Sequence, residues 1–414
     1  MLGDFIAVSA DAERLRSCIL GAYLDAFCAR LADLGYRRST IRNKLWVVSL
    51  FSRWMTDEQV AVVDLDERCV DEFVDARRRR GRTCRGFRRT LLQLLEQLRA
   101  ADVVPKPEVV RDDSPAEALL VRYEGYLRQE RALAESTIAA YLSFVRNFIA
   151  KYLDGGCAQS DALRSDDIRD FLLARVHRMA PKRAQFMGTA LRSFLRFLFL
   201  RGETATDLAF AVPTVRQWRL SSVPRYLPEE DVERLLGGCD TSLATGRRNH
   251  AILLLLARLG LRASEIMALE LDDLRWREGE VIVRGKGKVR DRLPLLPDVG
   301  KALVLYLSKD RPTCRSRCVF VCRQAPYRGF SHPSSVTTIV TRALDRAGLE
   351  PPTRGAHLLR HSLATTMVRR GASLTEIGQV LRHRSPNTTE IYAKLDFDAL
   401  RNVALPWPTT GGAS

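Results

Sequence analysis

A helical pattern of apolar residues occurs twice in the first 200 residues of this 414-residue chain. The copies begin at Ser39-Thr40 and Ser136-Thr137, and each pair is followed by apolar residues at helical spacing. Those residues are Val47, Leu50, Phe51 and Trp54 in the first copy, and Phe144, Phe148 and Ile149 in the second. Serine and threonine are residue types that cap helices at their start. The pattern therefore predicts two amphipathic helical bundles.

Later positions match at an offset of roughly 97 to 99 residues. The matched pairs are Val70 with Ile168, Phe73 with Phe171, Thr90 with Thr189, and Leu95 with Phe194. This period is too long for a solenoid repeat, so we interpret the region as two copies of one small helical domain. Chance similarity between two amphipathic bundles is the alternative.

Two proline-containing stretches divide the chain. Three prolines lie between residues 103 and 115, and three more lie between residues 213 and 228. Because proline interrupts helices, these stretches predict domain boundaries. We expect helical domains at residues 1–110 and 115–212, a linker at 213–227, a third domain at 228–403 and a tail at 404–414.

The charge balance favours a polyanionic partner. The chain has a formal net charge of +17 and a pI near 9.8, and Lys and Arg that neutralise phosphates release condensed counterions. An anionic membrane is the competing partner, but the sequence has no apolar run of about 18 residues. The first residues also lack the basic-then-apolar pattern of a signal peptide. We expect a cytoplasmic protein that binds nucleic acid and no membrane.

Arginines are concentrated in one stretch of the first helical segment. They are Arg77, Arg78, Arg79, Arg80, Arg82, Arg85, Arg88 and Arg89. A charge run of this kind is often only a solvated surface. In a chain this basic we expect phosphate contacts instead, and we predict Arg77, Arg78, Arg79, Arg80 and Arg85 as DNA-binding residues.

The third segment combines helices with a short sheet. Residues 280–284 and 291–295 flank Gly285-Lys286-Gly287-Lys288, which predicts a β-hairpin with a basic turn. Pro228 and the three acidic residues after it predict a helix start. Helical patterns also cover Ile252–Leu259 and most of 333–400. The predicted fold is mainly α with a small β-sheet.

Three of the nine cysteines, Cys314, Cys318 and Cys322, are evenly spaced. The spacing could indicate a metal site, but no Cys-x-x-Cys pair or nearby histidine cluster supports zinc. Val319-Phe320-Val321 predicts a buried strand between them. We therefore interpret the cysteines as small buried thiols, and we expect no metal.

One set of residues in the third segment carries candidate chemistry. Arg262 and Glu265 lie in Gly-Leu-Arg-x-Ser-Glu, and Lys286 lies in the predicted hairpin turn. His357 and Arg360 are three residues apart, on one face if helical. His383 and Tyr392 follow in the stretch HRSPNTTEIY. In this order and spacing, the set resembles the tyrosine recombinase family of phage-integrase and Xer-like enzymes. The resemblance covers residues from about 225 to 400, and residues 123–212 look like the family's helical core-binding domain.

The resemblance implies helical DNA-binding domains followed by a mixed α/β catalytic domain, which together clamp duplex DNA. Tyr392 would attack phosphorus and form a 3′-phosphotyrosyl link, while Arg262 and Arg360 would hold the non-bridging oxygens. His357 would accept a proton, Lys286 would protonate the departing 5′-oxygen and His383 would bind the phosphate. Glu265 would hold neighbouring groups in place. Lys288 is a DNA-contacting residue and an alternative to Lys286.

No cofactor is expected, because cationic side chains replace a metal and Gly285–Lys288 is not an ATP-binding phosphate loop. The resemblance implies double-stranded DNA with inverted half-sites, bound by two protomers, with four performing exchange. Related recombinases are a further hypothetical partner. Contact of Phe397–Val403 with a neighbouring protomer is a separate hypothesis. We interpret His361 as structural and Tyr226 as lacking a catalytic setting. Alternatives are a type IB topoisomerase and a non-catalytic DNA-binding protein.

Overall fold

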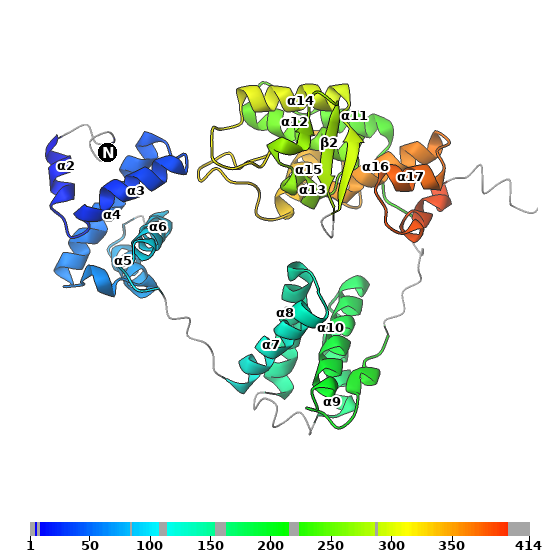
Figure 1. Ribbon diagram of the computed structural model, residues 1–414, viewed down its shortest axis with the longest axis horizontal. Helices are drawn as coiled ribbons and strands as arrows, with labels where there is room; N and C mark the ends of the chain where they lie inside the picture. The colour runs from blue at the N-terminus through cyan, green and yellow to red at the C-terminus, as the bar shows by residue number, and fades with distance from the viewer. Residues whose placement is uncertain are drawn as a thin grey trace, which may run out of the picture. The chain divides into compact units, whose positions relative to one another are not determined.

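The computed structural model describes residue 5 and residues 9–82, 85–106, 114–153, 163–214, 223–285 and 289–395. The chain divides into two compact units, one made of residues 1–107 and 222–414 and the other of residues 108–221. Helices make up most of both, and the described residues form one three-stranded sheet (Figure 1). The predicted fold class, mainly α with a small sheet, is confirmed.

The N-terminal part of the first unit is entirely helical where it is described. Its elements are α2 (Ser9–Arg16), α3 (Gly21–Asp33), α4 (Arg38–Asp57), η1 (Val62–Asp64), α5 (Glu67–Arg79) and α6 (Phe87–Ala100). One face of each longer helix carries apolar residues at helical spacing, which gives a shared core around Phe27, Phe51 and Phe73. Phe73 packs edge-on against Phe51, with ring centroids 5.2 Å apart.

The second unit is also a helical bundle. Its elements are α7 (Pro115–Gly125), η2 (Tyr126–Glu130), α8 (Glu135–Tyr152), α9 (Ser165–Val176), α10 (Pro181–Leu200) and η4 (Leu208–Ala211). Aromatic residues dominate its core, with Phe148 edge-on to Phe171 at 5.1 Å and Tyr123 edge-on to Phe194 at 5.2 Å.

The two bundles bury corresponding residues. Val70 and Phe73 on α5 are buried, as are their counterparts Ile168 and Phe171 on α9. Thr90 is buried whereas Thr189 is exposed.

The predicted capping by the Ser-Thr pairs is wrong. The N-cap positions of α4 and α8 are Arg37 and Ala134, so the serines and threonines lie inside the first turn.

Residues 223–395 hold a mixed helical and β structure. Its elements are α11 (Glu229–Gly237), α12 (Ala244–Arg258), α13 (Ala263–Ala268), η5 (Leu271–Asp273), β1 (Leu274–Arg275), β2 (Glu280–Arg284), β3 (Arg290–Pro294), α14 (Pro297–Lys309), α15 (Ser334–Arg346), α16 (Ala356–Arg369), α17 (Leu374–Val380), η6 (Pro386–Thr388) and η7 (Glu390–Leu395). The strands are antiparallel in the order β1-β2-β3, with Val281 opposite Leu293. The predicted hairpin is therefore present, although its turn lies outside the described residues.

The centre of this part is α12, whose residues from Ala251 to Ala257 are all buried. Helices α14, α15 and α16 pack against it. A smaller apolar cluster joins α16, α17 and η7 through Ala364, Ile377, Leu381 and Tyr392. The fold thus brings η7, the last element among the described residues, onto α16.

The predicted strand at Val319–Val321 is wrong in form. These residues are buried, but the segment makes only isolated bridges, Cys318 with Glu270 and Val321 with Gly329.

Cys314, Cys318 and Cys322 are half-buried free thiols rather than fully buried ones. Within the described ranges, no three His, Cys, Asp or Glu side chains gather as a metal site requires. Among those residues, too, no helix is both long and apolar enough to cross a membrane.

Candidate active site

The first catalytic candidates lie where α12 gives way to α13. Gly260 has a positive φ of 58°, which turns the chain after α12. Arg262 is the N-cap of α13, and Glu265 lies in its first turn. The Glu265 carboxylate accepts from the backbone N–H of Arg262 at 2.9 Å and from Nη1 of Arg262 at 2.6 Å. Glu265 is therefore fixed as the hydrogen-bonding partner of Arg262.

Glu265 is buried, with 3% of its surface exposed. Burial alone would raise the pKa of this carboxyl group. The backbone hydrogen bond from Arg262 and the charges of Arg382 and Arg262 outweigh burial and lower the pKa. Glu265 is thus an anion at neutral pH, surrounded by arginines.

Helix α16 presents His357 and Arg360 one turn apart. Arg360 is buried, with 4% exposed, and its two Nη atoms donate to the carbonyls of Gly260 and Leu381. Burial lowers the pKa of Arg360 to about 10, and the charges of Arg262 and Arg382 act in the same direction. The guanidinium stays charged at neutral pH, because even this lowered pKa is well above 7.

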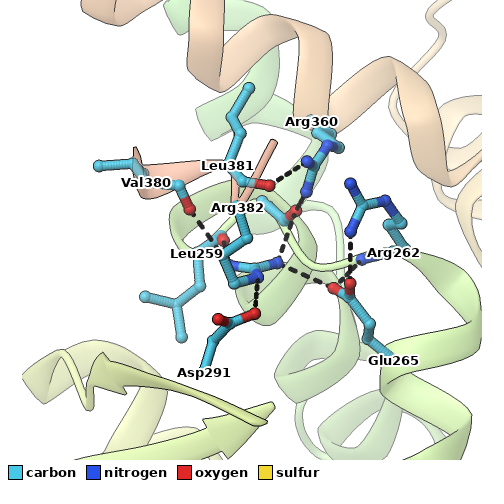
Figure 2. A network of polar contacts seen from close by, with 9 residues as sticks. Leu259, Arg262, Glu265, Asp291, Arg360, Val380, Leu381 and Arg382 are labelled. Atoms are coloured by element: carbon cyan, nitrogen blue, oxygen red, sulfur yellow. Dashed lines mark hydrogen bonds and ion pairs between the residues drawn. The ribbon is translucent and has the colours of Figure 1, made fainter. Parts of the chain in front are cut away.

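Arg382 lies at the centre of the polar network (Figure 2). Its Nη2 donates to Glu265 at 2.8 Å, and its Nη1 donates to the carbonyl of Val380 at 3.1 Å. No sequence motif singles out this arginine. A hydrogen bond to Glu265 joins residues 117 positions apart, and no local pattern encodes such a contact.

His383 follows Arg382 directly and is half-buried. Its Nδ1 lies 2.7 Å from Oγ1 of Thr389, and its backbone N–H donates to the carbonyl of Gly378 at 2.8 Å. Burial lowers the pKa of His383 to about 4, helped by the charges of Arg360 and Arg262. His357 is more exposed, yet partial burial of its ring and the charges of Arg360 and Arg262 also lower its pKa. Both imidazoles are therefore neutral at pH 7.

Tyr392 is held in the cluster formed by α16, α17 and η7, with 1% of its surface exposed. Its hydroxyl lies 2.7 Å from Nδ1 of His361. Burial raises the pKa of Tyr392 to about 12, while the charge of Arg360 opposes the rise. His361, interpreted from sequence as structural, is thus in direct contact with the candidate nucleophile. Its place directly after Arg360 was the only sequence signal.

The fold brings most of the predicted catalytic set together from four segments. Arg262 and Glu265 come from α13, His357 and Arg360 from α16, His383 from the loop after α17, and Tyr392 from η7. The charge of Arg360 affects the pKa values of His357, His383 and Tyr392, and the charge of Arg262 affects the pKa of Arg360, because these side chains lie near one another. Lys286, Lys288 and Phe397–Val403 lie outside the described residues.

This arrangement is suited to a phosphodiester. Two arginines whose charge persists at neutral pH present several N–H donors, and neutral imidazoles beside them can donate or accept a proton. Tyr226, the other tyrosine considered from sequence, is bound through its hydroxyl to Arg369 and lies under that guanidinium at 4.9 Å. Its setting differs from that of Tyr392.

The basic cluster on α5 and α6 is not uniform. Arg77 is half-buried and lies over the rings of Phe73 and Phe87, at 5.9 and 5.3 Å. Arg78 pairs with Asp75 at 3.3 Å. Arg79, Arg80 and Arg85 are exposed. The exposed members are therefore the better candidates for phosphate contact.

Comparison with known proteins shows the family of the chain. The sequence profile of the phage integrase family matches residues 225–398, and that of the phage integrase N-terminal SAM-like domain matches residues 120–202. The chain is 43% identical to the putative integrase/recombinase y4rA of Sinorhizobium fredii, over 93% of this chain and 94% of that protein. It is 31% identical to the tyrosine recombinase XerD of Listeria innocua, over 67% of this chain and 94% of XerD.

Solved structures show the same fold. XerH recombinase, bound to a palindromic difH substrate, superposes with a TM-score of 0.56 at 19% identity, over 73% of this chain and 99% of XerH. A lambda integrase dimer bound to a COC′ core site gives 0.51 at 17% identity, over 71% of this chain and 98% of that one. Fold and site together define a recombinase of the tyrosine type. The chain belongs to the phage integrase family and is a site-specific DNA recombinase.

Proposed function

We propose that this recombinase breaks and rejoins DNA through Tyr392, with a covalent 3′-phosphotyrosyl intermediate. The observation that carries the proposal is that Arg360 lies near Arg262, two neutral histidines and the buried Tyr392. A tyrosine ester of the phosphate preserves the bond for rejoining, so attack by a 5′-hydroxyl of another strand completes the exchange.

The arginines supply the electrostatic part of this mechanism. Negative charge builds on the phosphoryl oxygens in the transition state, and charge-assisted hydrogen bonds from Arg262 and Arg360 would stabilise it there. Arg360 already bonds two backbone carbonyls, which fixes its guanidinium before DNA arrives. Such preorganisation avoids reorganisation at the moment of reaction.

Tyr392 must change its surroundings to react. With a pKa of about 12, its ionisation at pH 7 costs about 7 kcal/mol in the DNA-free protein. A phenol with 1% exposure also cannot reach a phosphate without leaving its buried position. We propose that DNA binding moves Tyr392 from His361 to the phosphate beside Arg262 and Arg360.

The remaining residues take supporting roles in this proposal. His357 accepts the Tyr392 proton, His383 hydrogen-bonds the phosphate and Glu265 holds Arg262. The bond between Thr389 and Nδ1 of His383 supports the phosphate role, because a threonine that donates to Nδ1 leaves the proton on Nε2. Lys286 protonates the departing 5′-oxygen, and Lys288 contacts DNA or replaces Lys286.

The proposed partner is double-stranded DNA with inverted half-sites. Two protomers bind such a site and four perform exchange, with Phe397–Val403 contacting a neighbour. The structures that share the fold include a lambda integrase tetramer bound to a Holliday junction, at a TM-score of 0.51, which supports this assembly. Related recombinases are a further partner in this proposal. The integrase/recombinase name of the Sinorhizobium relative supports action on a mobile element, by integration or transposition.

The proposed division of labour follows the predicted domains. Residues 1–110 and 115–212 are DNA-binding helical domains, 213–227 is a linker, 228–403 is the catalytic domain and 404–414 is a tail. Exposed Arg79, Arg80 and Arg85 contact phosphates in this proposal, and Arg77 and Arg78 are secondary because of their protein contacts. The proposal places the protein in the cytoplasm, where its DNA substrate would be.

The type IB topoisomerase alternative and the non-catalytic alternative are less well supported. The family match favours recombination over relaxation. A protein that only bound DNA would need no tyrosine among the catalytic arginines.

The test uses DNA that carries the junctions flanking the protein's own gene or element. After incubation and denaturation, we expect a covalent protein–DNA adduct with the wild type and none with Tyr392→Phe, at equal DNA affinity. An adduct that persists in Tyr392→Phe would assign the nucleophile elsewhere. Relaxation of plasmid DNA without any such junction would instead favour the topoisomerase alternative.

A further inference from the structure

We propose that Arg382 is a positioning residue that holds the segment of Arg262 and Glu265, the Arg360 guanidinium and the loop of His383 in one arrangement. The inference rests on the proposed function, because it concerns the alignment of that catalytic set. Arg382 is not among the groups proposed to touch the phosphate.

The backbone of Arg382 gives the first indication. Its φ is +54°, in the left-handed region that favours glycine, and it lies between Leu381 and His383. An arginine there meets a steric cost that glycine would avoid. Its side chain must therefore supply contacts that offset this cost.

The side chain of Arg382 supplies such contacts. It is buried, with 6% exposed, and its guanidinium ends beside the turn between α12 and α13 (Figure 2). Nη2 donates to Oε2 of Glu265 at 2.8 Å and lies 3.5 Å from the carbonyl of Gly260. Nη1 donates to Val380 at 3.1 Å and lies 3.4 Å from the carbonyl of Leu259. One end of the residue is thus in the His383 loop and the other in the Arg262 segment.

Two acceptors of Arg382 are shared with proposed catalytic arginines. Glu265 accepts from the guanidinium of Arg262 through Oε1, and from Arg382 and the backbone N–H of Arg262 through Oε2. The carbonyl of Gly260 accepts from Arg360 as well as from Arg382. Moving Arg382 would therefore disturb both phosphate-binding arginines, although its own side chain is buried beneath them.

A third connection runs toward the hairpin. Oδ2 of Asp291, on β3, lies 3.9 Å from Nε of Arg382. Within the described part of the chain this Nε is buried and has no hydrogen-bond partner, so Asp291 is its nearby anionic neighbour. Strand β3 follows the turn that contains Lys286. Arg382 thus connects β3, which follows the proposed general acid Lys286 in the sequence, with the segment of Arg262 and Glu265.

Lysine could not replace this residue fully. The guanidinium serves acceptors on several sides because its donors are fixed in a planar fork, whereas an ammonium is a single point charge. Arg382→Lys should keep the attraction to Glu265 and lose the simultaneous carbonyl contacts. Arg382→Gly should lose every side-chain contact while easing the backbone.

The first test measures amide hydrogen exchange in the full-length, DNA-free protein. We expect Arg382→Gly to speed exchange at least tenfold at residues 261–265 and 383–389, with Arg382→Lys intermediate. The control is Gln59→Gly, which removes an exposed side chain at another position of positive φ (55°) and should leave both segments unchanged. Unchanged exchange in Arg382→Gly, or equal acceleration across the whole protein, would overturn the proposal.

The second test measures covalent cleavage against DNA affinity. We expect Arg382→Gly to slow formation of the Tyr392-dependent adduct by more than tenfold at unchanged affinity, with partial rescue in Arg382→Lys. Asp291→Asn, which weakens the hairpin connection alone, should slow it less. Wild-type cleavage rates in Arg382→Gly would overturn the proposal. If the wild type forms no adduct, the proposed function fails, whereas the exchange experiment still decides the positioning role.

Discussion

Nδ1 of His361 and the hydroxyl of Tyr392 lie 2.7 Å apart, with the tyrosine ring tilted at 55° to the imidazole. The pair joins α16 to η7, and Tyr392 is buried in the apolar cluster between them. The phenol is therefore held against His361 rather than presented to solvent.

This contact predicts energetic coupling between His361 and Tyr392. His361→Ala should destabilise the protein by about 1–3 kcal/mol, because it leaves a buried hydroxyl without its partner. Tyr392→Phe removes the hydroxyl, so His361→Ala should cost about 1 kcal/mol less in that background. Urea unfolding of the two single variants and the double variant measures this coupling. Strict additivity would show that the hydrogen bond contributes nothing.

The charges around His383 predict its titration. Burial and the neighbouring arginines lower the pKa of its imidazole to about 4. The unfolded chain then binds a proton that the folded protein does not between about pH 6.5 and pH 4. The contribution of His383 to stability is therefore complete above pH 6.5 and is lost as the pH falls toward 4. Proton NMR can follow this residue, because the chain has only six histidines.

We expect the His383 imidazole signal, assigned by its loss in His383→Gln, to shift with a midpoint near pH 4. A midpoint close to 6.5 would mean that neither burial nor the arginines shift the pKa of this ring. About a quarter of the imidazoles would then be protonated at pH 7.

We predict that a side chain at Gly260 would cost stability, both because of a close contact and because of the backbone conformation. Its φ is +58°, and a Cβ there would lie 2.8 Å from Cδ2 of Leu381. Gly260→Ala should therefore cost at least about 2 kcal/mol of stability and displace the carbonyl that Arg360 and Arg382 share. Gly348→Ala is the matched control, since its φ is +62° and its Cβ would meet nothing within 4 Å. Equal unfolding free energies for the two variants would contradict the steric argument.

Within the proposed catalytic set, neighbours on one helical turn could be predicted from the sequence. Arg262 with Glu265 and His357 with Arg360 are local pairs, so one helical turn fixes their geometry and spacing shows it. The hairpin followed from two short segments, 280–284 and 291–295, that flank a glycine-containing stretch. Contacts across long separations did not follow. Arg382 with Glu265 and His361 with Tyr392 depend on how α16, α17 and η7 pack, which spacing does not encode.

Two local predictions failed for identifiable reasons. Val319–Val321 has the β-branched, apolar composition of a strand, but strand formation also needs a partner edge, and here each pairing ends after one bridge. The Ser-Thr pairs have good capping side chains, but Arg37 and Ala134 already have the extended backbone of an N-cap. Backbone conformation one or two residues earlier decided the helix start.

The exposed arginines of the N-terminal helices predict a salt-dependent contribution to DNA binding. Arg79 and Arg80 lie at the C-terminal end of α5 and are exposed. If each contacts one phosphate, Arg79→Ala with Arg80→Ala should weaken DNA binding and reduce the slope of log affinity against log salt by about 2, since each contact releases nearly one counterion. Arg68→Ala is the control, because Arg68 is on the same helix but pairs with Glu72 at 2.9 Å. Its slope should match that of the wild type. A double variant with the wild-type slope would show that these arginines are a solvated surface, leaving phosphate contact by this helix to other side chains.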